Sequence, residues 1–153
     1  FLQNPLVVLA SVNHPLAKKK KITLKRIAEE PFIFRENGSG TRIETESFFT
    51  KQNLKLKTKM TLGSNEAIKQ AMLGGLGVSV LSRHTLTLDS HKDQLAVLDV
   101  KGFPINCQWH YAYPSGKNLS IVAQTFLAYL QNPPQLIVDL ALTGVGIITF
   151  PER

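Results

Sequence analysis

The chain has little cysteine, no long apolar run and no metal-binding pattern. Its single cysteine, Cys107, rules out an internal disulfide framework and is compatible with a reducing compartment. No apolar run approaches the roughly eighteen residues of a membrane-spanning helix, and the amino terminus lacks the basic, apolar, small-residue order of a signal peptide. The four histidines show no metal-ligand spacing. We therefore expect a soluble intracellular protein with no membrane partner, no metal and no cofactor.

Catalytic groups are also sparse. Cys107 lies close to Trp109, in a setting typical of a packed cysteine rather than a nucleophile. Glu29 and Glu30 precede Pro31 at the end of a predicted helix, where carboxylates are usually solvated, although such a pair raises the question of acid–base chemistry. No positioned nucleophile or base accompanies the other polar residues. We therefore expect no enzymatic activity.

Positive charge is what the chain has in excess, with a formal net charge of +7. Part of the excess is local, because Lys18 to Lys21 are followed by Lys25 and Arg26. Basic charge favours anionic partners but does not choose among nucleic acid, membrane surfaces and small phosphates. Because no aromatic residue is interleaved with the lysines, we interpret the run as a solvated surface.

Strand and helix signals alternate along the 153 residues, a length that fits one domain or two small lobes. Short apolar runs predict strands at 6–10, 32–34, 60–62, 78–81, 95–98 and 109–113. Between them, N-cap residues predict helices that begin at Thr23, at Thr41 with Glu44 in a capping box, at Ser64 or Asn65, and at Ser120. The alternation predicts an α/β fold with a sheet packed on both faces.

The loop at residues 35–42 follows a predicted strand and opens a predicted helix, which is where α/β folds bind ligands. It offers flexible backbone, hydroxyl groups and guanidinium groups, which together suit a small anion. The residues that carry these groups are Gly38 and Gly40, Ser39 and Thr41, and Arg35 and Arg42. The simpler alternative is that the loop only makes a turn and caps a helix. It is not a P-loop, because no Lys-Ser or Lys-Thr pair follows its last glycine.

A second strand-to-helix junction lies at residues 63–66, with Ser64 and Asn65 as polar side chains. Two such junctions in one sheet can face a single pocket. Helix capping alone explains Ser64 or Asn65 equally well. The glycines of 74–77 follow a helix and precede a strand, the reverse of a phosphate loop, so we interpret them as a helix C-cap and turn.

Four stretches, taken in order, resemble the effector-binding domain of LysR-type transcriptional regulators over residues 4–130. They read NPLVVLASVNHPLA, ITLKRIAEEPFIFRENGSGTR, GSNEAIKQAMLGGLGVSVLS and WHYAYPSGKNLSIVAQTFLAYL. The Arg-Glu-x-Gly-Ser-Gly-Thr-Arg form of the loop is similar to the branch that controls carbon-fixation and inorganic-carbon-uptake genes in autotrophs, cyanobacteria and some plastids.

The resemblance implies a periplasmic-binding-protein-like fold of two α/β lobes, with an effector in the cleft between them. Residues 1–11 would belong to the first lobe and the crossover, 12–95 would form a complete second lobe, and 96–132 would return to a truncated first lobe. Residues 133–153 match no part of the family that we can assign. Residues 39–41 would hold the acidic group of the effector and 64–65 the second side of the pocket. The implied effector residues are Arg35, Ser39, Gly40, Thr41, Arg42, Ser64 and Asn65.

The same resemblance implies phosphorylated or carboxylated effectors, such as ribulose bisphosphate, phosphoglycolate or 2-oxoglutarate, and a homo-oligomer in the cytoplasm or plastid stroma. The helix-turn-helix of a full regulator does not precede Phe1, so we expect a fragment without sequence-specific DNA binding of its own. A periplasmic-type solute-binding protein or a small α/β enzyme remains the alternative. The coding sequence upstream of Phe1 would discriminate, since a sensor needs a helix-turn-helix there and a transport protein a secretory segment.

Overall fold

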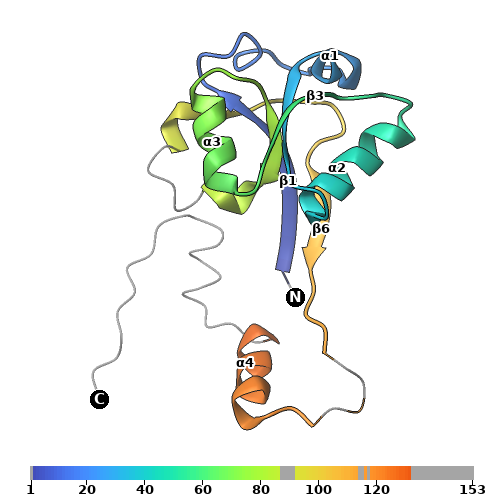
Figure 1. Ribbon diagram of the computed structural model, residues 1–153, viewed down its shortest axis with the longest axis vertical. Helices are drawn as coiled ribbons and strands as arrows, with labels where there is room; N and C mark the ends of the chain where they lie inside the picture. Colours follow the sequence, from blue (N-terminus) through green and yellow to red (C-terminus); the bar gives the residue numbers. More distant parts are fainter. Residues whose placement is uncertain (1, 87–91, 114–115, 117, 132–153) are drawn as a thin grey trace. The chain divides into compact units, whose positions relative to one another are not determined.

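The computed structural model describes residues 2–86, 92–113, 116 and 118–131 (Figure 1). The chain divides into two compact units, and the larger one, Asn4–Cys107, contains both predicted ligand junctions. The smaller unit includes a helix, α4 (Ile121–Gln131), which begins after Ser120 as predicted. The predicted tail at 133–153 lies outside the described residues, and the lobe boundaries stay a prediction.

The larger unit alternates strands and helices, as the sequence predicts. Its strands are β1 (Leu2–Ser11), β2 (Pro31–Arg35), β3 (Lys57–Leu62), β4 (Ser79–Ser82), β5 (Leu95–Val97) and β6 (Ile105–Trp109), of which β1 and β6 extend beyond it. Its helices are α1 (Leu24–Ala28), α2 (Gly40–Lys51) and α3 (Asn65–Leu73), and two short 3-10 turns cover Arg83–Leu86 and Lys92–Gln94. None of the described helices has the length and hydrophobicity to span a membrane.

Two sets of strands make up the sheet structure. β1 pairs antiparallel with β4 and β5 and also pairs with β6, whereas β2 and β3 pair in parallel. A parallel bridge between Phe32 and Val78 connects β2 to the residue before β4, and the Ser79 hydroxyl donates to the Ile33 carbonyl over 2.7 Å. The antiparallel pairing of the long first strand was not predicted from the sequence.

The parallel pair contains one irregularity. Phe32 is opposite Thr58, but the next residue, Ile33, is opposite Met60, so Lys59 is an extra residue in β3. After this bulge the strands run in step, and they end together with Arg35 opposite Leu62. Because parallel strands end at the same edge, the loops that lead into α2 and α3 both leave the strand pair at that edge.

The pair β2–β3 is packed on both faces, which confirms the prediction. Phe32 and Phe34 belong to one buried cluster together with Phe49 of α2, while Ile33 belongs to a second cluster with Ile68 of α3. The three named phenylalanines also form stacked and edge-to-face ring contacts. Figure 1 shows α2 and α3 on opposite sides of the strands. Burial of such side chains contributes about 1.5 to 3 kcal/mol each, which fixes the strand ends that carry the polar loops.

Two boundary predictions are wrong. Thr41 does not cap α2: the N-cap is Ser39, and Thr41 lies inside the first helical turn. Gly38, with φ +88, makes the turn that lets the helix start two residues early. The strand predicted at 109–113 is displaced, because β6 ends at Trp109 and residues 110–113 have no regular secondary structure. In β6 half-buried Ile105 and Cys107 alternate with exposed residues, and that alternation is a stronger strand signal than the aromatic residues that follow.

Candidate functional site

The start of α2 presents uncommitted polar groups. Ser39 has an extended backbone and its hydroxyl makes no capping hydrogen bond, while its N–H donates to the Glu36 carbonyl over 3.2 Å. The first N–H groups of a helix have no intrahelical acceptor, and the helix dipole makes this end partially positive. The N–H groups of Gly40 and Thr41 and the Ser39 hydroxyl are therefore suited to an anion.

The start of α3 is capped in the ordinary way. The Ser64 hydroxyl accepts from the N–H of Ala67 over 3.1 Å, and Glu66 lies in the first turn, where an acidic side chain favours the helix dipole. Asn65 is the first residue of the helix, and its side chain is free to point away from the helix axis. Of the two candidates for this cap, the structure selects Ser64.

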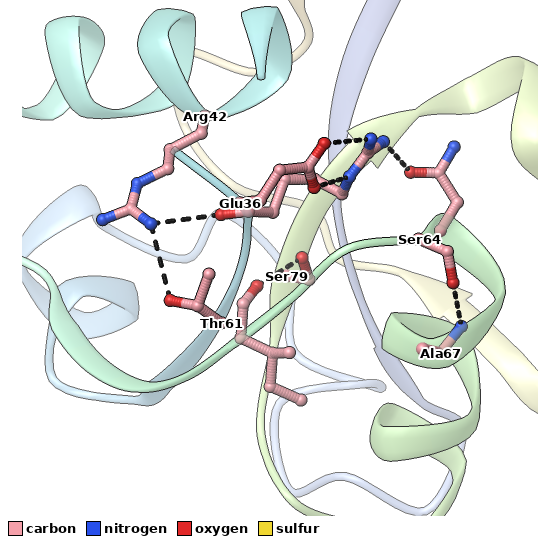
Figure 2. Close-up of polar contacts among 9 residues, drawn as sticks. Glu36, Arg42, Thr61, Ser64, Ala67 and Ser79 are labelled. Atoms are coloured by element: carbon pink, nitrogen blue, oxygen red, sulfur yellow. Dashed lines mark hydrogen bonds and ion pairs between the residues drawn. The ribbon is translucent and has the colours of Figure 1, made fainter. Parts of the chain in front are cut away.

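Arg35, at the end of β2, connects the two junctions (Figure 2). Its Nη1 donates to Oδ1 of Asn65 over 2.6 Å, so one guanidinium joins the end of β2 to the first residue of α3. Its Nε and Nη2 donate to the two carboxylate oxygens of Glu36, each over 2.8 Å. The Arg35 side chain is 22% exposed and that of Glu36 45%. The guanidinium thus joins the end of β2 to the start of α3 while it already holds a carboxylate.

This pairing shifts both titrations. The hydrogen bonds from Arg35 lower the pKa of Glu36 to about 2, and the hydrogen bond to Glu36 raises the pKa of Arg35. Both groups are therefore charged at neutral pH. Two parallel N–H···O bonds fix the geometry of this charge-assisted pair.

Arg42 is held differently. Its Nε donates to Glu46 over 2.8 Å, and its Nη1 reaches the Arg35 carbonyl at 3.1 Å and the Thr61 hydroxyl at 3.4 Å (Figure 2). Its guanidinium also lies over the Phe34 ring, 5.2 Å from the centroid. These contacts tie α2 to the ends of β2 and β3, so Arg42 stabilises the loop that carries Ser39.

The structure therefore places the predicted residues at one edge of the β2–β3 pair but gives them different tasks. Arg35 bonds directly to Asn65, and residues 39–41 form the start of α2. Arg42 stabilises that start through its bond to the Arg35 carbonyl, whereas the Ser64 hydroxyl caps α3. Sequence reasoning missed Glu36. The only signal for Glu36 was its position next to Arg35 in the same loop. That position is equally compatible with a solvent-exposed carboxylate and with a carboxylate at a ligand site.

A cavity of about 570 Å³ lies elsewhere, toward the carboxyl-terminal half of α2. Its lining includes Phe34, Phe49, Thr50, Leu54 and Lys55. None of the predicted effector residues lines it. We place the candidate ligand site at the polar residues around Arg35 rather than in this cavity, because those residues supply oriented hydrogen-bond donors and charge.

Other reactive groups do not assemble into a centre. Within the described ranges, no three His, Cys, Asp or Glu side chains are grouped as metal ligands would be. Burial raises the pKa of the Cys107 thiol, and the charge of Glu44 adds to the effect, so the thiol stays protonated. His14 lies 3.5 Å from Glu30, and its Nδ1 accepts from the N–H of Leu16, which are contacts of a packed loop.

Known proteins similar to this chain form one group. A family model described as the LysR substrate binding domain matches residues 1–135. The chain is 57% identical over 130 residues to the HTH-type transcriptional activator CmpR of Synechocystis sp., covering 85% of this chain and 43% of the relative. It is 48% identical over 130 residues to the RuBisCO operon transcriptional regulator of Acidithiobacillus ferrooxidans, covering 85% of this chain and 42% of the relative. The chain thus spans less than half the length of these relatives.

A solved structure is also similar to this chain. It is the regulatory domain of CcmR from Synechocystis PCC6803 in complex with 2-PG. The TM-score is 0.80 at 48% sequence identity, and the match covers 85% of this chain and 62% of that chain.

Proposed function

Because the chain belongs to the LysR substrate binding domain family, we propose that it is the sensing part of a regulator of carbon-assimilation genes and binds a small anionic metabolite. The predicted α/β, periplasmic-binding-protein-like fold class is that of the family. The proposal favours a sensor over a solute-binding protein or an enzyme. It is supported by relatives that are named as transcriptional regulators.

One observation carries the proposal: the guanidinium of Arg35, at the end of β2, bonds to Asn65 at the N-terminus of α3, and the loop that follows Arg35 opens α2. Two helix N-termini and a guanidinium give a positive potential and many N–H donors at one edge of the sheet. An anion bound there would contact Arg35, Ser39 and Thr41 together with Asn65. A carboxylate or phosphate group suits this donor set.

Among candidate effectors we place 2-phosphoglycolate first, because the CcmR domain, at 48% identity, was solved in complex with 2-PG. Ribulose bisphosphate and 2-oxoglutarate are the other candidates, since both carry anionic groups that could use the same donors. Further parts of the proposal are a homo-oligomeric regulator, DNA binding through an amino-terminal helix-turn-helix, and a location in the cytoplasm or plastid stroma. Light scattering tests the oligomer, and a monomer at high concentration would count against it.

Calorimetric titration of the chain with the three metabolites tests the function. We expect at least one to bind, and Thr41→Ala to weaken that binding about tenfold or more, because a hydrogen bond to a charged group contributes roughly 1.5 to 3 kcal/mol. Because Thr41 is not the N-cap, the melting temperature of the Thr41→Ala variant should differ little from that of the original chain. Thr50→Ala, in the same helix but lining the 570 Å³ cavity, is the matched control. Loss of binding in Thr50→Ala alone would place the ligand in that cavity and contradict the proposal.

A further inference from the structure

We infer that Glu36 is a built-in competitor for the effector, which occupies the guanidinium fork of Arg35 in the empty protein and has to be displaced when an anion binds. This inference rests on the proposed function and names a residue that sets the affinity and selectivity of the same site.

The geometry of the fork carries the argument. A guanidinium has five N–H donors, and its Nε and Nη2 edge matches the two oxygens of a carboxylate or phosphate. In this chain that edge is filled by the two Glu36 oxygens, each at 2.8 Å, and Nη1 is engaged with Asn65 at 2.6 Å. An effector that needs a bidentate contact with Arg35 therefore meets an occupied edge (Figure 2).

Glu36 is also free to leave. Its side chain is 45% exposed, and it is the residue directly after Arg35, so it can rotate into solvent without uncovering the core. The bond from Arg35 to Asn65 does not involve Glu36 and can persist during the exchange. Glu36 can thus swing out while the guanidinium stays bonded to Asn65.

Charge gives the exchange its selectivity. Displacing Glu36 costs the same free energy for every anion that uses this edge of Arg35. A single ligand carboxylate replaces one carboxylate by another and gains little beyond that cost. A phosphate group carries more charge and more acceptor oxygens, so it gains more from the guanidinium and the nearby helix N-terminus. With Glu36 in place, the site should therefore bind a phosphate and hardly bind a monocarboxylate.

Calorimetry with Glu36→Gln and the matched control Glu44→Gln separates competition from other roles. Glu44 is an exposed residue of α2, so its substitution removes the same charge without touching the fork. For 2-phosphoglycolate we expect Glu36→Gln to bind about two- to fivefold more tightly. A partly exposed ion pair lowers the population of molecules with an unpaired Arg35 by about this factor. Glu44→Gln should bind within twofold of the original chain. For glycolate, the gain from Glu36→Gln should be no larger than that for 2-phosphoglycolate, because the cost of displacing Glu36 does not depend on the anion.

A second measurement does not depend on affinity. In nuclear magnetic resonance spectra, the Arg35 Nε–H signal should differ between the original chain and Glu36→Gln when both are free, and should converge when both are saturated with 2-phosphoglycolate. Signals that stay apart at saturation would mean that Glu36 keeps its contact, and would overturn the inference.

The outcomes separate the inference from the function on which it rests. Equal or weaker binding by Glu36→Gln, with an unchanged melting temperature and a binding original chain, would make Glu36 a positioning residue, and the proposed function would stand. Binding by Glu36→Gln alone would support strong competition. No binding of any candidate by either protein would remove the proposed function and the inference together.

Discussion

Nη1 of Arg35 donates to Oδ1 of Asn65 over 2.6 Å and so joins two loops that are 30 positions apart in the sequence. The last residues of β2 and β3 are paired with each other, so the junctions after the two strands lie close enough for one side chain to reach from the first to the second. A ligand that binds Arg35 consequently meets groups from both loops. The site is a property of the strand pair rather than of the glycine-containing loop alone.

Replacing Arg35 by methionine should lower effector affinity about tenfold or more, because it removes a charged donor from the centre of the site. The melting temperature should fall only slightly, since partly exposed ion pairs contribute little to stability. Calorimetry and a thermal melt measure the two effects. Arg26→Met is the control, because Arg26 is ion-paired with Glu30 far from the junctions in sequence. Equal loss of affinity in both variants would contradict a specific role for Arg35.

Ser39 and Ser64 should separate binding from capping. Ser64→Ala removes a real cap and should cost about 1 kcal/mol of the free energy of unfolding, whereas Ser39→Ala removes a hydroxyl that makes no capping bond and should cost less. Effector affinity should fall in Ser39→Ala by more than in Ser64→Ala. Urea unfolding and calorimetry on both variants give the comparison, and the opposite ranking of stabilities would show that Ser39 is the more important cap.

Gly77 is expected to be the least replaceable glycine between α3 and β4. Its φ is +155, and a Cβ there would lie 2.2 Å from the Pro31 carbonyl oxygen, which accepts the N–H of Val78. Gly77→Ala should therefore lower the free energy of unfolding by about 3 kcal/mol or more, from backbone strain and from displacement of β2. Gly63→Ala is the control, since a Cβ there meets nothing within 4 Å. Similar urea midpoints for the two variants would refute the expectation.

Titration of Glu36 should report its ion pair. Its pKa is lowered from 4.5 to about 2 by the hydrogen bonds from Arg35, so the pair stabilises the folded state above pH 4.5 and that contribution is lost as the pH falls through about 2. Carboxyl-carbon nuclear magnetic resonance should give a midpoint near 2, and Arg35→Met should return it toward 4.5. A midpoint near 4.5 in the original chain would mean that the pair is not formed in solution.

Local signals in the sequence predicted most elements because they depend on neighbours in the chain. Thr23 was predicted as an N-cap and Ser64 as one of two candidates with Asn65, and the side chains of Thr23 and Ser64 each accept a hydrogen bond from an N–H three residues later. Thr41 failed because Ser39 competes for the same role two residues earlier. Choosing between them requires the positive φ of Gly38, which no residue pattern specifies.

Long-range features could not be read in this way. The contact of Arg35 with Asn65 depends on the parallel register of β2 and β3, and a strand pattern does not encode register. Lys69 shows the same limit: a lysine in a helix predicts an exposed side chain, but this one is 3% exposed and ion-paired with Glu66. The strand-to-helix junctions and the resemblance to a known family predicted the candidate site residues, and the structure supplied the hydrogen bonds that each of them makes.

The extra residue in β3 has a consequence for changes in chain length. Lys59 is exposed and has no partner position in β2, since the pairing passes from Thr58 to Met60. Deleting Lys59 would straighten the ladder and leave Leu62 opposite Arg35, whereas a deletion after β3, at Gly63, meets no bulge that absorbs it and would draw Asn65 away from the guanidinium. Related proteins could therefore lose a residue at the bulge without moving the candidate site, while a deletion in the loop before α3 would move one of its side chains.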